Sequence, residues 1–261
     1  MTSNKRSIHP SHREHPLVAV NRQGAYTCDG CKMEGMGLRY RCEGCNYDLH
    51  QECMFAPPKL KIQEHKYRFL ERPLPGPDCT RVDCTKCRSC DACGMAVKGF
   101  VYHCSKTGFD FHPRCAKLES KISIGDVTFW LEKQGPSSCA WCKRKLLNGA
   151  KKKIPGWSYV SKYDDYNFHV FCVMEMAMQS SSTSSNLNAT TGGDSSLAVY
   201  QKMKLPLIAK SKKGGAYSRN KWLEILKIFL STLFSILLGD PTTIIASTAA
   251  HLVTQGLFHQ G

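Results

Sequence analysis

The residues of this 261-residue chain that could do chemistry are its 15 cysteines and 10 histidines. Three Cys-x-x-Cys pairs are each followed downstream by a His-x-x-Cys pair. Thiolates and imidazoles at this spacing are typical ligands of zinc, which takes four N or S atoms in a tetrahedron. Four protein ligands leave no open position, which predicts structural rather than catalytic sites. The predicted sets are Cys28, Cys31, His50, Cys53; Cys90, Cys93, His112, Cys115; and Cys139, Cys142, His169, Cys172.

A further Cys-x-x-Cys pair, Cys42 and Cys45, lies inside the first set. These two thiols need two more ligands, so they predict a second zinc site. His15 is the upstream candidate, with His12 and His9 as competitors, and His65 follows downstream. In the second set Thr107 replaces the second cysteine of this pair, and in the third set Ser161 and Asp164 stand at the two positions. We therefore expect three to four zinc ions.

Four cysteines have no place in this scheme. Two of them, Cys84 and Cys87, form another Cys-x-x-Cys pair, which we interpret as an insertion with exposed thiols because no histidine or acidic partner repeats around it; a redox or auxiliary metal site is the alternative. The four are Cys79, Cys84, Cys87 and Cys104.

An internal repeat indicates the elements that must position these ligands. Sliding the sequence by 62 positions places residues 28–53 on 90–115 with ten identities in 26 positions and no gap. This pattern predicts one structural unit used twice. A third copy keeps the ligand order but has a longer interval with an aromatic run at 154–168. Units of this size bury too little apolar surface to fold alone, so the metal is expected to hold them.

The segments HPSHREHPL, YTCDGC and YRCEGCNYDLHQEC resemble the divergent form of the C-one (phorbol-ester/diacylglycerol-type) zinc finger, abundant in plant cysteine/histidine-rich proteins. CDACGMAVKGFVYHC and IPGWSYVSKYDDYNFHVFC resemble further modules of the same family. The resemblance covers about residues 9–178 and implies compact β-rich fingers with two interleaved zinc sites in a complete module. It implies one site from Cys28, Cys31, His50 and Cys53, and another from His15, Cys42, Cys45 and a downstream ligand, with His65 as the candidate.

The sequence departs from the lipid-binding form of that family. The interval between Cys31 and Cys42 holds ten residues with neither Pro nor Gln, whereas the lipid-binding form has a longer loop there. This difference argues against diacylglycerol as a ligand. The family suggests intracellular signalling or stress-response roles, with protein as the expected partner and loops 32–41 and 94–102 as candidate surfaces. The aromatic run is either a binding platform or core, and we favour core.

Composition divides the chain into five parts. We expect zinc modules at 9–65, 66–120 and 126–178, a polar flexible linker at 179–200, and a basic helical tail at 201–261. Within the tail, residues 201–227 hold eight Lys+Arg and one Glu. An amphipathic helix with a polar stripe at Glu224, Lys227, Ser231 and Ser235 should follow, and Gly239-Asp240-Pro241 should start a second helix of a hairpin.

Three interpretations of the tail remain. The hairpin could pack on itself or on another chain, lie on an anionic membrane surface through residues 201–239, or insert as a re-entrant element. The N-terminus lacks a secretory signal, so we expect an intracellular protein, in the cytoplasm or nucleus.

Three function classes fit the sequence. The first is a non-catalytic interaction protein, which we favour. The second is a nucleic-acid-binding protein, which the net charge of +15 permits. The third is a thiol–disulfide oxidoreductase, which the Cys-x-x-Cys pairs suggest although no βαβ pattern surrounds them.

Overall fold

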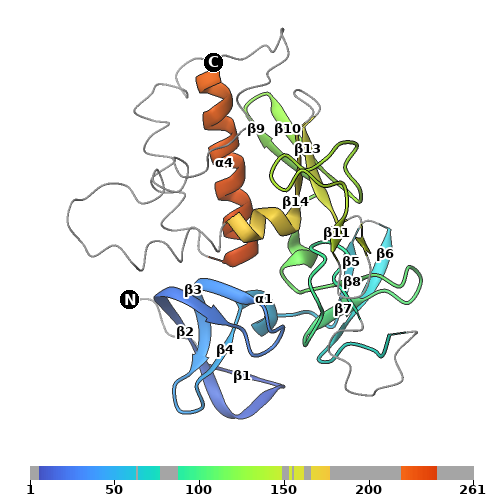
Figure 1. The fold of residues 1–261 in the computed structure, drawn as a ribbon. Helices are drawn as coiled ribbons and strands as arrows, with labels where there is room; N and C mark the ends of the chain where they lie inside the picture. The colour runs from blue at the N-terminus through green and yellow to red at the C-terminus, as the bar shows by residue number, and fades with distance from the viewer. Residues whose placement is uncertain are drawn as a thin grey trace, which may run out of the picture.

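The computed structural model describes residues 6–62, 64–76, 88–148, 153–154, 156–161, 166–176 and 219–239. Small β-rich modules follow one another along the chain, and a long helix lies beside them (Figure 1). This agrees with the expected fold class of tandem metal-held modules. The expected linker, the basic segment before the helix, the second helix of the hairpin, Cys79, Cys84 and Cys87 lie outside the described residues.

Each module consists of a hairpin, a Cys-x-x-Cys turn, a second hairpin and a short helical segment. Module 1 has strands in the order β1-β2-β3-β4, module 2 in the order β5-β6-β7-β8, and module 3 in the order β14-β13-β10-β9. Module 1 comprises β1 (Ser7–His9), β2 (His12–Thr27), β3 (Glu34–Cys42), β4 (Tyr47–Leu49) and α1 (Gln51–Met54). Module 2 comprises β5 (Lys59–Ile62), β6 (His65–Leu70), β7 (Val101–His103), β8 (Asp110–Phe111) and the 3-10 helix η1 (Cys115–Lys117). Module 3 comprises β9 (Lys121–Ile124), β10 (Val127–Glu132), β13 (Ser158–Ser161), β14 (Tyr166–His169) and helical residues 170–176, with β11 (Leu147–Asn148) paired to β12 (Lys153–Ile154).

The module boundaries differ from those expected. The hairpin β5–β6 belongs to module 2, because Arg68 pairs with His103 of β7. Module 2 therefore begins near residue 59 rather than 66, and module 3 begins with β9 at Lys121 rather than at 126. The upstream hairpins carry no repeated cysteine, so the sequence repeat stops short of them.

The strand register shows which residues of the three modules are equivalent. Val18, Arg68 and Trp130 lie opposite equivalent residues of the next strand. The preceding residues, Leu17, Tyr67 and Phe129, are all buried, with exposed fractions of 0%, 2% and 0%. One apolar side chain from the upstream hairpin thus fills the core of each module.

The same backbone joint links successive modules. The Phe100 N–H donates to the Gly30 carbonyl at 2.9 Å, and the Trp157 N–H donates to the Ala92 carbonyl at 2.9 Å. Gly30 and Ala92 are both the third residue of their Cys-x-x-Cys turns. A Cβ on Gly30 would lie 2.5 Å from the Phe100 ring, so the joint requires a small residue. Trp141 holds this position in module 3 and is too bulky for another such joint.

Replacing Gly99 by Ala is expected to destabilise the joint between modules 1 and 2. The added Cβ would overlap the Gly30 carbonyl oxygen, and overpacking of this kind costs about 1–3 kcal/mol. Urea unfolding of the zinc-loaded chain measures the loss. Gly44→Ala is the control, because nothing lies within 4 Å of the Cβ it adds. Equal stability of the two variants would show that the contact between Gly99 and Gly30 does not hold modules 1 and 2 together.

The predicted amphipathic helix is present as α4 (Arg219–Leu238). Its apolar face packs on module 3, where the Phe229 ring stacks on Phe129 with centroids 3.8 Å apart and meets the edge of Tyr159 at 5.6 Å. Of the expected polar stripe, Glu224 pairs with Lys227 at 2.6 Å, but Ser231 is buried, with 3% exposed. The tail therefore packs on its own chain's modules rather than only on itself. None of the helices described has the length and apolarity needed to cross a membrane.

Arg114 ties the end of α4 to modules 1 and 2. Its Nη1 donates to the Leu237 carbonyl at 3.0 Å, and its Nε donates to the Glu52 carboxylate at 3.2 Å. A cation at this point satisfies an unpaired carbonyl and complements the negative end of the helix dipole. One buried guanidinium thus joins three parts of the molecule.

Candidate metal centres

The structure brings together all three predicted sets of three cysteines and one histidine. In each set the four ligand atoms lie within 4.8 Å of one another. The first two cysteines come from a tight turn in which the N–H of Lys32, Gly94 or Lys143 donates to the carbonyl of the first cysteine. These three residues adopt positive φ angles of 62°, 76° and 60°. The last two ligands come from the end of the second hairpin and the helical segment that follows.

The histidine rings face the sulfurs through Nδ1. The distances from Sγ to Nδ1 are 3.3 Å for Cys31 and His50, 3.5 Å for Cys93 and His112, and 3.4 Å for Cys142 and His169. All twelve residues are buried except Cys142, which is half-buried. Four inward-facing donors of this kind fit a tetrahedral ion and leave no room for a substrate.

A reciprocal contact supports each of the first two turns. The Asp29 N–H donates to the Asp48 carbonyl at 2.7 Å, and the Asp48 N–H donates to the Asp29 carboxylate at 2.9 Å. Asp91 and Asp110 repeat both bonds in module 2. These aspartates hold the turn against the strand that leads to the ligand histidine. Their role was not predicted, although both are identities in the repeat.

In each of these three clusters the pKa of the first cysteine is lowered, which favours one thiolate. In module 3 the hydrogen bond from Cys172 lowers the pKa of Cys139 to about 3 and raises that of Cys172. Burial raises the pKa of Cys28, but hydrogen bonds from Cys31 and Cys53 outweigh it and lower the pKa. Burial also raises the pKa of Cys31 and Cys53, so these thiols keep their protons.

Zinc affinity is therefore expected to rise with pH. In module 1 zinc must displace the protons of Cys31 and Cys53, whose pKa values lie above the ordinary thiol value, whereas Cys28 is already ionised. Two protons should leave per zinc bound near neutral pH, so affinity falls as pH falls. Competition with a chromophoric chelator at several pH values measures this dependence. A pH-independent affinity would contradict it.

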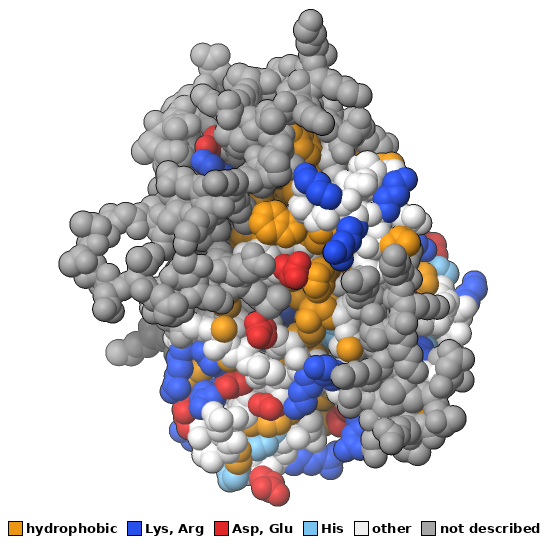
Figure 2. Space-filling view, viewed as in Figure 1, with side chains coloured by type: hydrophobic (Ala, Val, Ile, Leu, Met, Phe, Trp, Pro, Cys, Tyr) orange, Lys and Arg blue, Asp and Glu red, His pale blue; other side chains and the backbone are white. Residues whose placement is uncertain are grey.

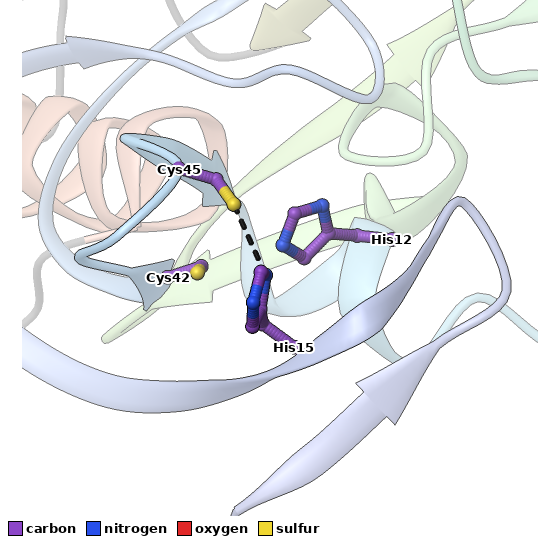
Figure 3. Close-up of side chains that lie close together, drawn as sticks. All are labelled: His12, His15, Cys42 and Cys45. Carbon is purple, nitrogen blue, oxygen red and sulfur yellow. Dashed lines mark hydrogen bonds between the residues drawn. The ribbon is translucent and has the colours of Figure 1, made fainter.

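A fourth cluster comprises His12, His15, Cys42 and Cys45, whose side chains converge in Figure 3. Both histidines lie on β2, Cys42 ends β3, and Cys45 lies in the turn to β4. The Cys45 Sγ lies 3.2 Å from His15 Nδ1, and the His12 ring stacks on Tyr47 at 4.6 Å. Unlike the other three, this cluster is open to solvent, because His15 and Cys45 are exposed.

The structure places His12, one of the alternatives from the sequence, in this cluster, and does not place His65 there. His65 begins β6, where strand register makes it the module 2 counterpart of His15. Cys104 corresponds in the same way to Cys42, but Thr107 replaces the second cysteine. The error followed from the misplaced boundary, which assigned His65 to module 1. His9 is not a ligand either: it stacks on Phe100 at 5.6 Å, and its Nδ1 lies 2.7 Å from the Ser11 hydroxyl.

A pair of substitutions separates the two histidines. His12→Ala should lower the zinc content by one ion per chain, because three ligands bind zinc far more weakly than four. His65→Ala should leave the content unchanged. Metal analysis after gel filtration gives both values. Loss of an ion from the His65 variant alone would restore the original assignment.

Comparison with known proteins agrees with this geometry. Residues 10–54 match the family model described as the C1 domain. Over 49 residues the chain is 43% identical to "Probable nucleoredoxin 1" of Arabidopsis thaliana, a match that covers 19% of this chain and 8% of the relative. Over 57 residues it is 33% identical to "Probable nucleoredoxin 3" of the same plant, covering 22% of this chain and 14% of the relative.

The chain thus spans less than a sixth of the length of these curated relatives. No solved structure matches it. The matched family model covers the first three-cysteine, one-histidine cluster together with the cluster drawn in Figure 3. Residues 10–54 are therefore a C1 domain, and its cluster of three cysteines and one histidine recurs in two further modules of the chain.

Proposed function

We propose that this chain is a zinc-binding, non-catalytic interaction protein of intracellular signalling or stress response. Thiolate and imidazole donors in tetrahedral reach of one another favour zinc over harder cations. All four clusters suit it, so we expect four ions, at the upper end of the range from the sequence. The zinc would hold the modules folded and would take no part in a reaction.

The observation that best supports this function is the closure of the three repeated clusters. Each offers four protein ligands and is buried among its own module's strands. The joints at Gly30 and Ala92 then fix the modules to one another through backbone contacts. A scaffold of this kind presents a fixed surface to a partner without an open metal position.

The buried thiols argue against an oxidoreductase. Cys28 and Cys31 are 0% and 1% exposed, and Cys90 and Cys93 are both 0% exposed, so a substrate disulfide cannot reach them. Among the described cysteines only Cys45 is fully exposed, and it belongs to the fourth cluster. The two relatives are named as probable nucleoredoxins, but the shared segment is too small a part of them to transfer that activity.

We place the proposed contact surface away from loops 32–41 and 94–102, which were the candidates from the sequence. Residues 34–42 form β3, which pairs with β2 along its length and with β4 at residues 40–42, and residues 99–100 pack in the joint. Trp157, Tyr159 and Phe168 of the aromatic run are buried core. Phe55, which is 55% exposed and meets the edge of Tyr40 at 5.0 Å, is a better protein contact. Phe229 of α4 packs on module 3 and most of the helix's described apolar side chains are buried, so we do not assign them to a membrane. Strand β3, paired with β2 along its length, gives diacylglycerol no open loop.

Quantitative affinity capture with the full zinc-loaded chain tests the proposal. Phe55→Ser should lose a set of bound proteins while zinc content and fold remain, since this side chain is exposed. In parallel, the chain should not catalyse reduction of insulin disulfides, with thioredoxin as the positive control. Catalytic turnover would replace the proposal with the oxidoreductase, and identical capture by both chains would remove Phe55 from the surface.

A further inference from the structure

One face of the β5–β6 hairpin carries four cations in directly opposed pairs. Lys59 lies opposite Arg68, and Lys61 lies opposite Lys66. All four are exposed. The alternate side chains turn to the other face and pack against the core; they are Leu60, Ile62, Tyr67 and Phe69. Like charges directly opposite each other on a strand pair are destabilising, so the module keeps this arrangement at a cost in stability.

Module 3 shows that the fold does not require these cations. At the equivalent positions of β9–β10, Lys121 lies opposite Trp130, and Ser123 lies opposite Thr128. The Lys121 ammonium is 6.0 Å from the Trp130 ring centroid, and the two hydroxyls are 3.0 Å apart. Both are favourable cross-strand pairs. Three of the four cations therefore have no counterpart in module 3, so the architecture does not require them.

Little negative charge offsets the cations on the hairpin. Glu64 in the turn lies 3.4 Å from Lys61 and is the only carboxylate within β5, β6 and the described part of their turn, so four cations less one carboxylate leave +3. On the neighbouring strand β7, His103 lies opposite Arg68. The Asp110 carboxylate contacts His103 and also forms an ion pair with Arg88, so it is already occupied. On module 1, by contrast, Lys/Arg and Asp/Glu side chains lie side by side (Figure 2). The hairpin face thus keeps charge that a polyanion could neutralise.

We propose that this face binds the phosphate backbone of double-stranded nucleic acid without reading its sequence, a contact beyond the scaffold function proposed above. Lysine and arginine bind phosphates by releasing counterions, and a two-stranded ribbon fits the groove of a duplex. The face offers no exposed aromatic ring on which single-stranded bases could stack, because Tyr67 and Phe69 point to the core. It also offers no exposed apolar side chain to enter a bilayer interface.

The double variant Lys61→Ser/Lys66→Thr tests this by transplanting the module 3 pair onto module 2. In the full zinc-loaded chain, anisotropy of a labelled DNA duplex is titrated at several salt concentrations. Losing two phosphate contacts should lower affinity roughly 10- to 100-fold near 0.1 M salt and reduce the slope of log K against log salt by about 1.8. Stability to urea should stay equal or rise, because the like-charge pair is gone.

The control Lys117→Ser/Lys145→Thr removes two exposed lysines from other elements. It changes the net charge equally and should reduce the slope by less than half as much. An equal loss in both variants would overturn the proposal, since binding would then follow net charge alone. Three other results would also overturn the proposal: tighter binding of the single strand of the same sequence, absence of duplex binding at low salt, and binding only to vesicles containing phosphatidylserine.

Discussion

Removing the metal is expected to unfold the modules. A structural zinc site contributes about 10–16 kcal/mol of apparent binding free energy at neutral pH, which is as large as the whole stability of a typical domain. Each module buries only a few large side chains around its cluster, so its sheet cannot persist alone. Chelation should abolish the β-sheet circular dichroism of residues 9–178. It should also release α4, because Phe129 and Tyr159 form the surface on which Phe229 packs.

A matched pair of cysteines in module 2 separates metal loss from loss of a buried thiol. Cys90→Ser should unfold module 2 and break both joints, because Cys90 belongs to the module 2 cluster and that module supplies Phe100 to one joint and Ala92 to the other. Cys104→Ser changes an equally buried cysteine that belongs to none of the four clusters, so a cost of only about 1 kcal/mol is expected. Native-like circular dichroism after complete zinc removal, or equal effects of the two substitutions, would show that the modules do not need the metal to stay folded.

Phe229→Ala is expected to detach α4 from the modules. The ring is fully buried, stacks on Phe129 and contacts Tyr159 and Phe168, and truncating such a side chain costs about 3–5 kcal/mol. The Cys/His clusters do not include this residue, so the sheets should remain. Hydrogen exchange should then show loss of protection confined to residues 225–238, which is local unfolding of one element.

Ser235→Ala serves as the control on the same helix. Its hydroxyl donates to the Ser231 carbonyl within α4, so its loss should change stability by no more than about 0.5 kcal/mol. If the Phe229 variant keeps full protection in α4, the contacts at Arg114 and Leu237 would be sufficient to dock the helix, and the aromatic stack would be secondary.

The sequence by itself determined the chemistry of the modules. Ligand identity and spacing specified the three clusters of three cysteines and one histidine, because a tetrahedral ion needs two short local pairs and the chain repeats them. The apolar period of residues 222–238 likewise predicted α4. These features are local, since they depend on residues a few positions apart or on a pattern that the chain copies.

Only the tertiary structure decided what depends on strand register and on distant contacts. His12 replaced His65 in the fourth cluster because the β5–β6 hairpin pairs with β7, which no cysteine spacing reveals. The docking of α4 against Phe129, and the opposed cations Lys61 and Lys66, follow from elements that meet only in the folded chain. The metal ligands could be predicted because they lie a few residues apart in the sequence, whereas the surface could not, because its residues come together only when distant strands pair.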